Sequence, residues 1–263
     1  MSDDAQKRSA PGVWHGQVRM GLGWGWFQGA VGDPAAHAHY AIQLVLSDRP
    51  VPVWTTSDGW QPRCAVLLGP SLMHALGRSD GAVTLVYLEP DSGAGRRIRQ
   101  LLRNGVAELT HAQQVACRAA LAARPQAPDE ALADSLVPNG LVVAGRCIDP
   151  RIDALLDGID ARLDEAISTA RLAATAGMSI SHFQHRFRAQ TGMPVRPYLR
   201  WRRLLGAMQA VLSGASLTDA ALQAGFADAA HFTRTMRRHF GITPRTLAVM
   251  AASADRRFVQ DAS

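Results

Sequence analysis

Three histidines and one glutamine in the first third of the chain have the donor atoms of a metal site. His37, His39 and Gln43 are closely spaced, and His74 follows later in the sequence. On a strand, positions 37, 39 and 43 share one face, because side chains alternate across a sheet. With His74 from a later strand they would offer three imidazole nitrogens and one oxygen, and imidazoles suit Zn, Ni, Cu or Fe. The pattern predicts a candidate transition-metal site, although a polar pocket lining or ordinary strand histidines would give the same spacing.

A second set of side chains, the arginines, gathers in the C-terminal part of the chain. The net charge is +6. Residues 1–150 contain 13 Lys and Arg against 13 Asp and Glu, whereas residues 151–263 contain 15 against 9. Within 166–250 there are 11 arginines and only two acids, Asp219 and Asp228. This excess is the electrostatic footprint of phosphate binding, although a solvated basic surface would show the same balance.

These arginines fall within a weak internal repeat. The first copy covers 172–193 and the second 220–242, and the two copies share alanine, glycine and large apolar residues at matching positions. Gly177 and Gly225, for example, are 48 residues apart. The constant offset indicates one structural unit used twice.

Each copy has the residue pattern of a helix-turn-helix unit. Ala173 and Ala221 are small where the second helix must cross the first closely, and a glycine occupies the turn, where a positive φ is often required. Apolar residues four apart on the second helix share one face and pack into the core. They are Phe183 and Phe187 in the first copy and Phe232 and Met236 in the second. The opposite face of each second helix is then free for DNA.

Capping residues and periodicity set the helix ranges. Ser216 and Asp219 fit a capping box, in which the serine oxygen accepts an early amide hydrogen and the carboxylate accepts from the serine amide. Ser168 can cap the first unit. Apolar residues recur at spacings of three and four between the units, which predicts a rigid spacer helix. We expect the first helix-turn-helix unit at about 168–190, the spacer helix at about 197–213 and the second unit at about 216–240.

The N-terminal part has the pattern of short strands. Apolar runs of strand length, bounded by turn-forming residues, lie at 41–46, 64–68 and 83–88,. They predict a small β-barrel or sandwich. Further along, the period becomes helical, which predicts helices at about 94–123 with Thr110 as a cap. These helices would cover the barrel or pair with a second subunit.

Length and composition set the domain organisation. At 263 residues the chain is long enough for two domains, and its 47% hydrophobic content is sufficient for globular cores,. Turn signals near Asp149 place the boundary between them. The expected fold class is α+β, with a strand-rich domain over 1–149 and an all-helical domain over 150–263.

The chain has no sequence signal for secretion or membrane insertion, and its cysteines form no metal-binding or redox motif. There is no apolar run of about 18 residues, and the N-terminus lacks the apolar stretch of a secretory signal, so we expect a cytoplasmic protein without a membrane partner. Cys64, Cys117 and Cys147 are widely separated, which excludes a CxxC motif,. We expect inert buried thiols, with redox sensing by one of them as the alternative.

The C-terminal residues resemble the AraC/XylS family of transcription regulators. The resemblance covers about 166–250 and is most specific between Ala224 and Pro244. It rests on the turn glycines, the helix cores and the run that closes the second copy, namely Leu172, Ala173, Gly177, Met178, Ser179, Phe183, Phe187, Thr191, Gly192, Met193, Arg203, Leu204, Ala207, Leu212, Ala221, Gly225, Phe226, Phe232 and Phe240 to Arg245. Pro194-Val195 stands where the family usually has Ser-Pro, and Ala220-Ala221 replaces an aliphatic-Ala pair.

This resemblance implies that two recognition helices enter successive major-groove segments on one face of the duplex. Glutamine can pair bidentately with adenine and arginine with guanine, and alanine or threonine can touch a thymine methyl. Some of the arginines, Arg186, Arg188, Arg237 and Arg238, are expected to hold phosphates, which position the protein without reading sequence. Any of these side chains could also be plainly solvated. The candidate DNA-binding residues are Ser181, Gln184, His185, Arg186, Arg188, Ala229, Thr233, Arg234, Arg237 and Arg238.

The resemblance also implies the nature of the N-terminal domain and its partners. In many family members this domain is a cupin-like barrel that binds an effector and dimerises, which here implies a small-molecule or metal effector and a homodimer built by the 94–123 helices. Promoter DNA is the expected target, with RNA polymerase as a partner if the protein activates. Metal-binding cupins place a glutamate where this chain has Gln43. Trp24 and Trp26 share a strand face and could line an effector pocket or belong to the core.

Three function classes follow from these patterns. The first is a DNA-binding transcription regulator that is not an enzyme, whose barrel senses a small molecule or metal ion. The second is a metal-dependent cupin enzyme with a helical appendage, which would need an open metal position. The third is a structural or partner-binding helical protein, which leaves the paired recognition helices and their arginines unexplained.

Overall fold

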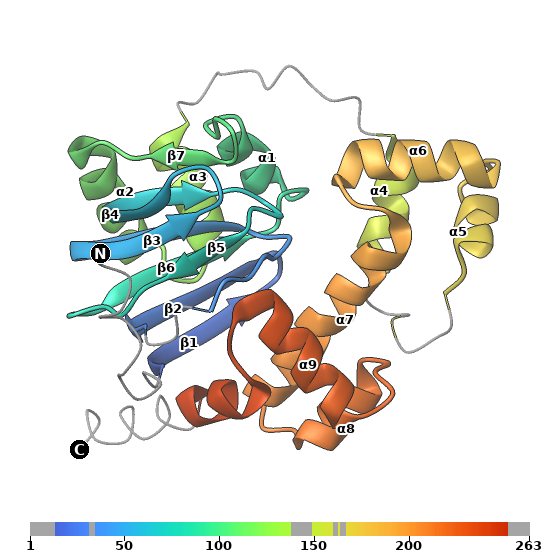
Figure 1. Cartoon of the computed structure of the whole chain (residues 1–263). Helices are drawn as coiled ribbons and strands as arrows, with labels where there is room; N and C mark the ends of the chain where they lie inside the picture. The colour runs from blue at the N-terminus through green and yellow to red at the C-terminus, as the bar shows by residue number, and fades with distance from the viewer. Residues whose placement is uncertain (1–13, 32–34, 138–148, 160–162, 164–166, 252–263) are drawn as a thin grey trace.

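The computed structural model describes residues 14–31, 35–137, 149–159, 163 and 167–251. The N-terminal part is an antiparallel sheet covered by helices, and the C-terminal part is all helical (Figure 1). The strands are β1 (His15–Gly21), β2 (Trp24–Ala30), β3 (Ile42–Thr55), β4 (Gly59–Leu68), β5 (His74–Leu76), β6 (Val83–Leu88) and β7 (Val106–Glu108). The helices are α1 (Gly93–Arg99), α2 (His111–Ala123), α3 (Pro128–Leu136), α4 (Pro150–Asp157), α5 (Thr169–Thr175), α6 (Ile180–Thr191), α7 (Val195–Leu212), α8 (Leu217–Gln223) and α9 (Ala229–Phe240).

The sheet is organised around the long strand β3. The strand order is β1-β2-β6-β3-β4-β7, and β5 pairs with the far half of β3. Residues 47–50, whose sequence favours a turn, lie inside β3, because an irregularity between Leu46 and Val51 allows the strand to continue at a shifted register,. Two of the expected strands are therefore longer than predicted, and β1 and β7 are the outer strands of the described sheet.

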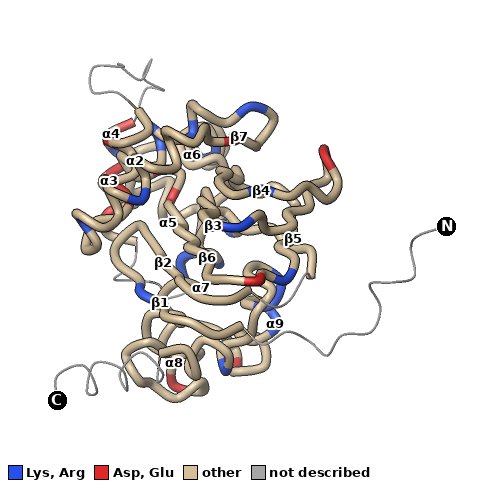
Figure 2. The backbone as a smooth tube through the Cα atoms, turned by 90° about the vertical axis from the view of Figure 1, so that its left-hand side faces the viewer, with Lys and Arg blue, Asp and Glu red and all other residues tan. Residues whose placement is uncertain are grey.

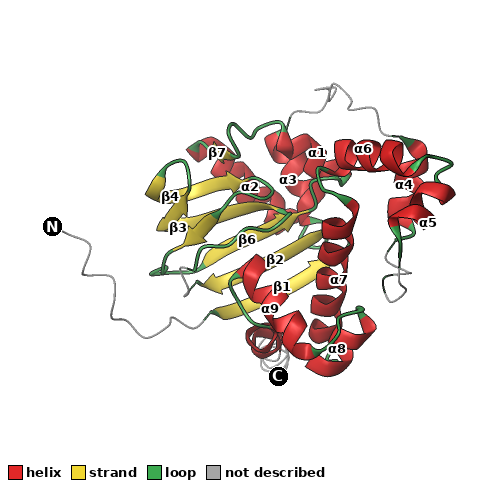
Figure 3. Ribbon diagram, turned by 45° about the vertical axis from the view of Figure 1, so that its right-hand side comes forward, coloured by secondary structure: helices red, strands yellow, loops and turns green. Residues whose placement is uncertain are grey.

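Alternation along β3 gives the sheet two different faces. Ile42 and Leu44 are fully buried and pack with α1, α2 and α3, together with Ile98 and Leu132. Val45, Val51 and Val53 of β3 belong to the core on the other face, which is continuous with the core of the C-terminal helices,. Figure 3 shows α7 and α9 beside this second face. The fold thereby brings the C-terminal part onto the interior face of the N-terminal sheet.

The helices that cover the first face differ from the prediction in two places. Two helices, α1 and α2, form within 94–123 as expected, but the short strand β7, which was not predicted, lies between them and pairs with β4. Thr110 caps α2 through a capping box with Gln113, as expected. Helix α3 was not predicted, and prolines such as Pro125 and Pro128 usually interrupt a helix,. Pro128 is in fact at the first helical position, where a missing amide hydrogen costs nothing,.

The C-terminal helices follow the predicted order. Both helix-turn-helix units and the spacer helix α7 are present. The spacer begins at Val195, before the predicted residue 197, because Pro197 lies in the first turn, which tolerates proline,. At the start of α8, Ser216 accepts from the Asp219 amide as predicted, but the Asp219 carboxylate accepts from the Ser216 hydroxyl at 2.6 Å. The Asp219 carboxylate thus accepts from the Ser216 hydroxyl, where the capping box predicted the Ser216 amide.

Buried polar contacts join the two parts of the chain. The Arg202 guanidinium on α7 donates to Glu89 at 2.5 Å, and the Trp201 indole donates to the same carboxylate at 3.3 Å. Tyr198 donates to Asp91 at 3.0 Å. The predicted boundary near residue 149 stays a prediction, since residues 138–148 lie outside the described part. The spacer helix is nevertheless fixed to the N-terminal part by specific bonds.

Two further expectations concern the membrane and the thiols. Among the described residues, no helix has the length and apolarity needed to cross a membrane. Cys117 is a buried free thiol, and burial raises its pKa to about 11, which makes its reactive thiolate scarce,. Cys64 is a half-buried free thiol. Cys147 lies outside the described residues.

Candidate nucleic-acid interface and effector sites

The two helix-turn-helix units have the same backbone geometry. Gly177 and Gly225 both adopt positive φ, at 64° and 76°. The residue after each glycine donates its amide hydrogen back to the first helix, from Met178 to Ala173 and from Phe226 to Ala221, both at 2.9 Å. The turns therefore confirm the predicted repeat at the level of individual hydrogen bonds.

The recognition helices α6 and α9 also begin and end alike. Ser179 accepts from the amide of residue 182, and Asp228 accepts from that of residue 231. A left-handed glycine closes each helix, Gly192 after α6 and Gly241 after α9,. The predicted core residues Phe183, Phe187, Phe232 and Met236 are all buried. Each recognition helix is thus held by one apolar face, which leaves the other face outward.

Most predicted DNA-binding residues lie on these outward faces. Seven of the ten are exposed, and Ala229 and Thr233 are partly exposed. Thr233 donates its hydroxyl hydrogen to the Ala229 carbonyl at 2.8 Å, so that hydrogen is already engaged within the helix. Figure 2 marks Lys and Arg along the backbone in blue, including positions in α9. The seven exposed residues are Ser181, Gln184, His185, Arg188, Arg234, Arg237 and Arg238.

Arg186 is placed differently from the other candidates. Its side chain is only partly exposed, and its guanidinium lies 3.6 Å from the carboxylate of Asp149 at the start of α4. Asp149 also pairs with Arg151 at 2.9 Å. Arg186 therefore lies beside the start of α4, and its role as a phosphate contact stays a prediction.

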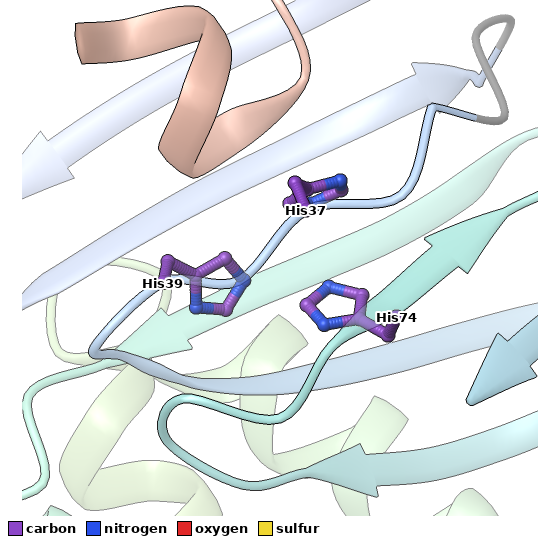
Figure 4. A group of neighbouring side chains, drawn as sticks. All are labelled: His37, His39 and His74. Carbon is purple, nitrogen blue, oxygen red and sulfur yellow. The ribbon is translucent and has the colours of Figure 1, made fainter. Parts of the chain in front are cut away.

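The histidine cluster forms, although not on the element expected. Only His37 in the stretch 35–41 pairs with another strand, through an isolated bridge to His74, and Gln43 lies on β3. The ligand nitrogens of His37, His39 and His74 nevertheless all lie within 4.8 Å of one another, and the three side chains are buried. Figure 4 shows the three imidazole rings grouped below the end of a C-terminal helix. The three histidines are thus grouped as predicted, but His37 and His39 do not lie together on one strand.

Backbone carbonyls fix the orientation of all three imidazoles. The Nδ1 atoms of His37, His39 and His74 lie 2.9, 3.0 and 2.9 Å from the carbonyl oxygens of Ala35, Ala41 and Leu72. Burial lowers the pKa of His39 well below its usual value and the pKa of His74 to about 4. Because a neutral imidazole that donates from Nδ1 carries a lone pair on Nε2, these rings present metal-ligand atoms.

Gln43 completes the cluster and is the residue least satisfied there. Its amide oxygen lies 2.9 Å from His39 Nε2 and 3.0 Å from His74 Nε2. Two lone pairs directed at an amide oxygen repel one another unless a cation lies between them or the amide turns its nitrogen towards them. The buried amide nitrogen of Gln43 has no hydrogen-bond partner among the described residues. The donor set and its orientation fit a transition-metal ion.

A separate pocket lies between the sheet and the C-terminal helices. Its volume is about 390 Å³, and it is lined mainly by apolar side chains from β1, β2, α7 and the residues after α9. Trp26, Phe27 and Trp201 are among them. Two arginines, Arg19 and Arg202, also line it, and the Arg19 guanidinium lies 4.1 Å from the centre of the Trp26 ring. Trp24 and Trp26, which were expected to line a pocket or belong to the core, both line this pocket.

Comparisons with known proteins agree with the C-terminal geometry. Residues 172–248 match the family model of a helix-turn-helix domain. The virulence regulon transcriptional activator VirF of Yersinia enterocolitica is 37% identical over 76 residues, and the HTH-type transcriptional activator RhaS of Escherichia fergusonii is 30% identical over 114 residues. Residues 172–248 therefore form a helix-turn-helix domain that is similar in sequence to part of each of these two transcriptional activators. These matches cover 28% and 43% of this chain, and 28% and 41% of the two relatives.

The fold of the whole chain also has a solved counterpart. ToxT from Vibrio cholerae O395 superposes with a TM-score of 0.60 at 11% identity, over 88% of this chain and 99% of ToxT. This likeness confirms the two-domain fold, in which an N-terminal sheet precedes the helix-turn-helix domain.

Several contacts between the helix-turn-helix domain and the N-terminal part could not be found from the sequence. His239 donates from Nδ1 to the carbonyl of Ala38 at 3.1 Å, and Phe240 stacks on His39 with ring centres 5.6 Å apart. Tyr40 donates its hydroxyl to the carbonyl of Thr191 at the end of α6. These pairs are about 150 to 200 residues apart in sequence, and no local pattern indicates them.

Proposed function

We propose that this chain is a DNA-binding transcription regulator that reads promoter DNA with α6 and α9. The observation that carries the proposal is the pair of equivalent, capped recognition helices whose outward faces hold arginine and glutamine side chains. Arg234 and Gln184 are the candidates for base pairing, since arginine and glutamine form bidentate bonds with guanine and adenine. Arg188, Arg237 and Arg238 are the candidates for phosphate contacts.

The remaining outward side chains complete the proposed interface. Ser181, His185, Ala229 and Thr233 lie at or near the outward faces and can contact base edges or the backbone. Thr233 and Ala229 offer methyl groups, which suit a thymine methyl. Regulation by activation would add RNA polymerase as a partner, and a homodimer would place two such domains on neighbouring sites.

The test is a titration of the full chain against the promoter of its own gene. A scrambled duplex of equal length serves as control, and both are measured at two salt concentrations. We expect tighter binding to the promoter and a steep loss of affinity with salt. Equal affinity for both duplexes would contradict sequence reading, and no binding at low salt would refute the proposal.

A regulator accounts for the histidine cluster better than an enzyme does. A catalytic metal needs an open coordination position that substrate can reach. Here the three histidines are at most 5% exposed, and Phe240 of α9 stacks directly on His39. Closure of the cluster by a DNA-binding helix supports a sensing role and argues against the metal-dependent enzyme alternative.

We further propose that the apolar pocket binds an apolar carboxylic acid as effector. Its lining gives hydrophobic contact, and Arg19 at its edge offers a charge for a carboxylate. A structure of ToxT from Vibrio cholerae strain SCE256 with a bound unsaturated fatty acid has a TM-score of 0.58 to this chain at 10% identity. That likeness motivates the ligand class for this pocket.

Tryptophan fluorescence can test the acid effector. A long-chain unsaturated fatty acid and its methyl ester are titrated against the native chain and an Arg19→Gln variant. We expect the acid to bind the native chain more tightly than the ester does, and the variant to lose that difference. Equal binding of acid and ester to the native chain would contradict a carboxylate site.

A divalent transition metal is the second candidate effector, held by His37, His39 and His74 with Gln43 Oε1. The Nδ1 atoms held by backbone carbonyls, and the Nε2 atoms of His39 and His74 directed at Gln43 Oε1, favour it. A bound ion would supply a positive charge and directional bonds that cross-link the segment around 37–39 to β3 and β5. Metal analysis of protein purified without an affinity tag tests it, and stoichiometric metal that is lost in a His37→Ala variant is the expected result.

A further inference from the structure

One short segment of the N-terminal part touches the C-terminal ends of both recognition helices. Residues 37–40 reach α6 through the Tyr40 hydroxyl, which donates to the Thr191 carbonyl. They reach α9 through the Ala38 carbonyl, which accepts from His239 at 3.1 Å. Residues 37–40 therefore form a common support for the two DNA-binding units, which are otherwise separated by the length of α7.

Ring and backbone packing strengthen the α9 contact. The ring of His39 stacks on Phe240 at an interplanar angle of 25°. Gly241 lies so close that a Cβ atom there would stand 3.3 Å from His37 Nδ1. Phe240 stacks in turn on Trp201 of the spacer helix, with ring centres 5.6 Å apart. Two of the three cluster histidines are thus in direct contact with the end of the second recognition helix.

Tyr40 connects the same segment to the spacer helix. Its ring lies edge-on to Tyr198 and Trp201 of α7, with both pairs of ring centres 6.1 Å apart. Tyr40 is 3% exposed. A change in the position of residues 37–40 would therefore alter packing contacts with α6, α7 and α9 at the same time.

The cluster histidines are part of this support. The backbone of His37 pairs with that of His74 at 2.9 and 3.0 Å, and Gln43 on β3 lies within hydrogen-bond distance of His39 and His74. An ion bonded at about 2 Å to each nitrogen would join 37–39 rigidly to β3 and β5. Because the ends of α6 and α9 rest on that segment, the ion would also restrict their movement.

We propose that a transition-metal ion bound by His37, His39, His74 and Gln43 tightens DNA binding by fixing residues 37–40 beneath both recognition helices. The expected increase in DNA affinity follows from the position of the contacts that residues 37–40 make with the two recognition helices. They involve the C-terminal ends of α6 and α9, while Gln184 and Arg234, the residues proposed to pair with bases, lie earlier along the same helices. Fixing the helix ends leaves those residues accessible and lowers the entropy lost when both helices order on the duplex. The inference rests on the proposed DNA-binding function and adds its regulation.

The coupling is reciprocal by thermodynamic necessity. If Zn²⁺ raises the affinity for promoter DNA, then promoter DNA raises the affinity for Zn²⁺ by the same factor. We expect a factor of about ten, within the range usual for coupled sites. The factor can be measured from either side, which provides an internal check.

The experiment uses the full chain, purified without an affinity tag and stripped with a chelator. Zn²⁺ alone is titrated in competition with a chromophoric chelator, and promoter affinity is measured with and without Zn²⁺. We expect one high-affinity Zn²⁺ per chain and about tenfold tighter DNA binding in its presence. A His37→Gln variant should lose the high-affinity Zn²⁺.

Variants outside the ligand set test the proposed route of coupling. Tyr40→Phe keeps the ring but removes the hydroxyl that reaches Thr191, and His239→Ala removes the bond to Ala38. Both should bind Zn²⁺ with native stoichiometry and lose most of the gain in DNA affinity. His111→Ala, an exposed histidine at the start of α2, is the matched control and should behave as the native chain does.

A gain-of-function variant keeps the test decisive if a histidine variant fails to fold. Gln43→Glu adds a carboxylate to the donor set and should tighten Zn²⁺ binding. Absence of stoichiometric Zn²⁺ from both the native chain and this variant would overturn the proposal. Stoichiometric Zn²⁺ with unchanged or weaker DNA binding would overturn the coupling.

The failure of the proposed function would look different. In that case neither the zinc-loaded nor the stripped chain would bind promoter DNA, which would refute the regulator and with it the coupling. Zinc stoichiometry would still report on the site. Native DNA binding without any zinc site would leave the regulator intact and refute only the inference.

Discussion

The two helix-turn-helix units share a backbone but differ in what surrounds them. The turn of the first unit is open, since a Cβ atom at Gly177 would meet nothing within 4 Å. The turn of the second unit is crowded, because a Cβ atom at Gly225 would stand 2.9 Å from the Leu163 carbonyl and 3.1 Å from Arg203. The two copies of an internal repeat can therefore keep the same local fold while one of them packs more tightly against the rest of the molecule.

The largest expected effect comes from emptying the core of either unit. Phe183→Ala and Phe232→Ala each remove a fully buried ring, and each should lower the free energy of unfolding by about 3–5 kcal/mol. Denaturant unfolding with hydrogen exchange measures both the total and its location. We expect loss of protection to spread further into the N-terminal sheet for Phe232→Ala, because α9 rests on that sheet. Equal spreading in both variants would remove the asymmetry between the units.

The turn glycines give a matched test of crowding. Gly177→Ala should cost about 1–2 kcal/mol, the strain of a left-handed residue alone. Gly225→Ala should cost more, since the new methyl group must also displace the Leu163 carbonyl or the Arg203 side chain. Thermal unfolding of the two variants measures the difference. A smaller loss for Gly225→Ala than for Gly177→Ala would show that the surroundings of the second turn yield easily.

DNA readout gives a further comparison between the units. Arg234→Ala should cost about 1–3 kcal/mol in binding and relax preference at one base, as loss of a bidentate pair does. Arg188→Ala in the first unit should weaken binding on every sequence and reduce the salt dependence, as loss of a phosphate contact does. Affinities on a panel of single-base variants distinguish the two. Uniform weakening by Arg234→Ala would contradict its role in base reading.

The smallest effect concerns the first unit alone. Hydrogen bonds from Arg151 lower the pKa of Asp149 to about 2, and Arg186 of α6 lies beside it. A carboxylate whose pKa falls on folding contributes stability above its unfolded pKa of about 3.9, and that contribution is lost as the pH falls towards 2. Asp149→Asn should therefore flatten the pH dependence of unfolding between about pH 4 and pH 2. If the free energy of unfolding of the native chain and of the variant depended on pH in the same way between pH 4 and pH 2, the stabilising pair of Asp149 with Arg151 would be contradicted.

Much of the C-terminal half could be predicted from the sequence because its signals are local. Capping serines, turn glycines and apolar residues four apart lie within a few positions of one another, and the structure confirms Ser168, Gly177 and Phe232 in those roles. The N-terminal half was harder. The sequence around Ser47 favours a turn, yet a shift in register keeps it within β3.

The candidate sites divide in the same way. Outward residues such as Arg234 follow from helix periodicity once the core face is known. Grouping of His37, His39 and His74 was expected from strand parity, but 35–41 is mostly not strand, and the group forms through backbone pairing of His37 with His74. The contact of Phe240 with His39 depends on the packing of two domains, which no local pattern specifies.

The Glu89–Arg202 pair limits how freely the two halves of such proteins can be exchanged. Both side chains are largely buried, and they come from different domains. A chimaera that joined this N-terminal domain to a relative's DNA-binding domain without an equivalent of Arg202 would leave a buried carboxylate without its cation, which destabilises proteins by about 3–5 kcal/mol. This N-terminal domain can therefore be joined to another helix-turn-helix domain only if the first half of the spacer helix, which contains Arg202, is transferred with it.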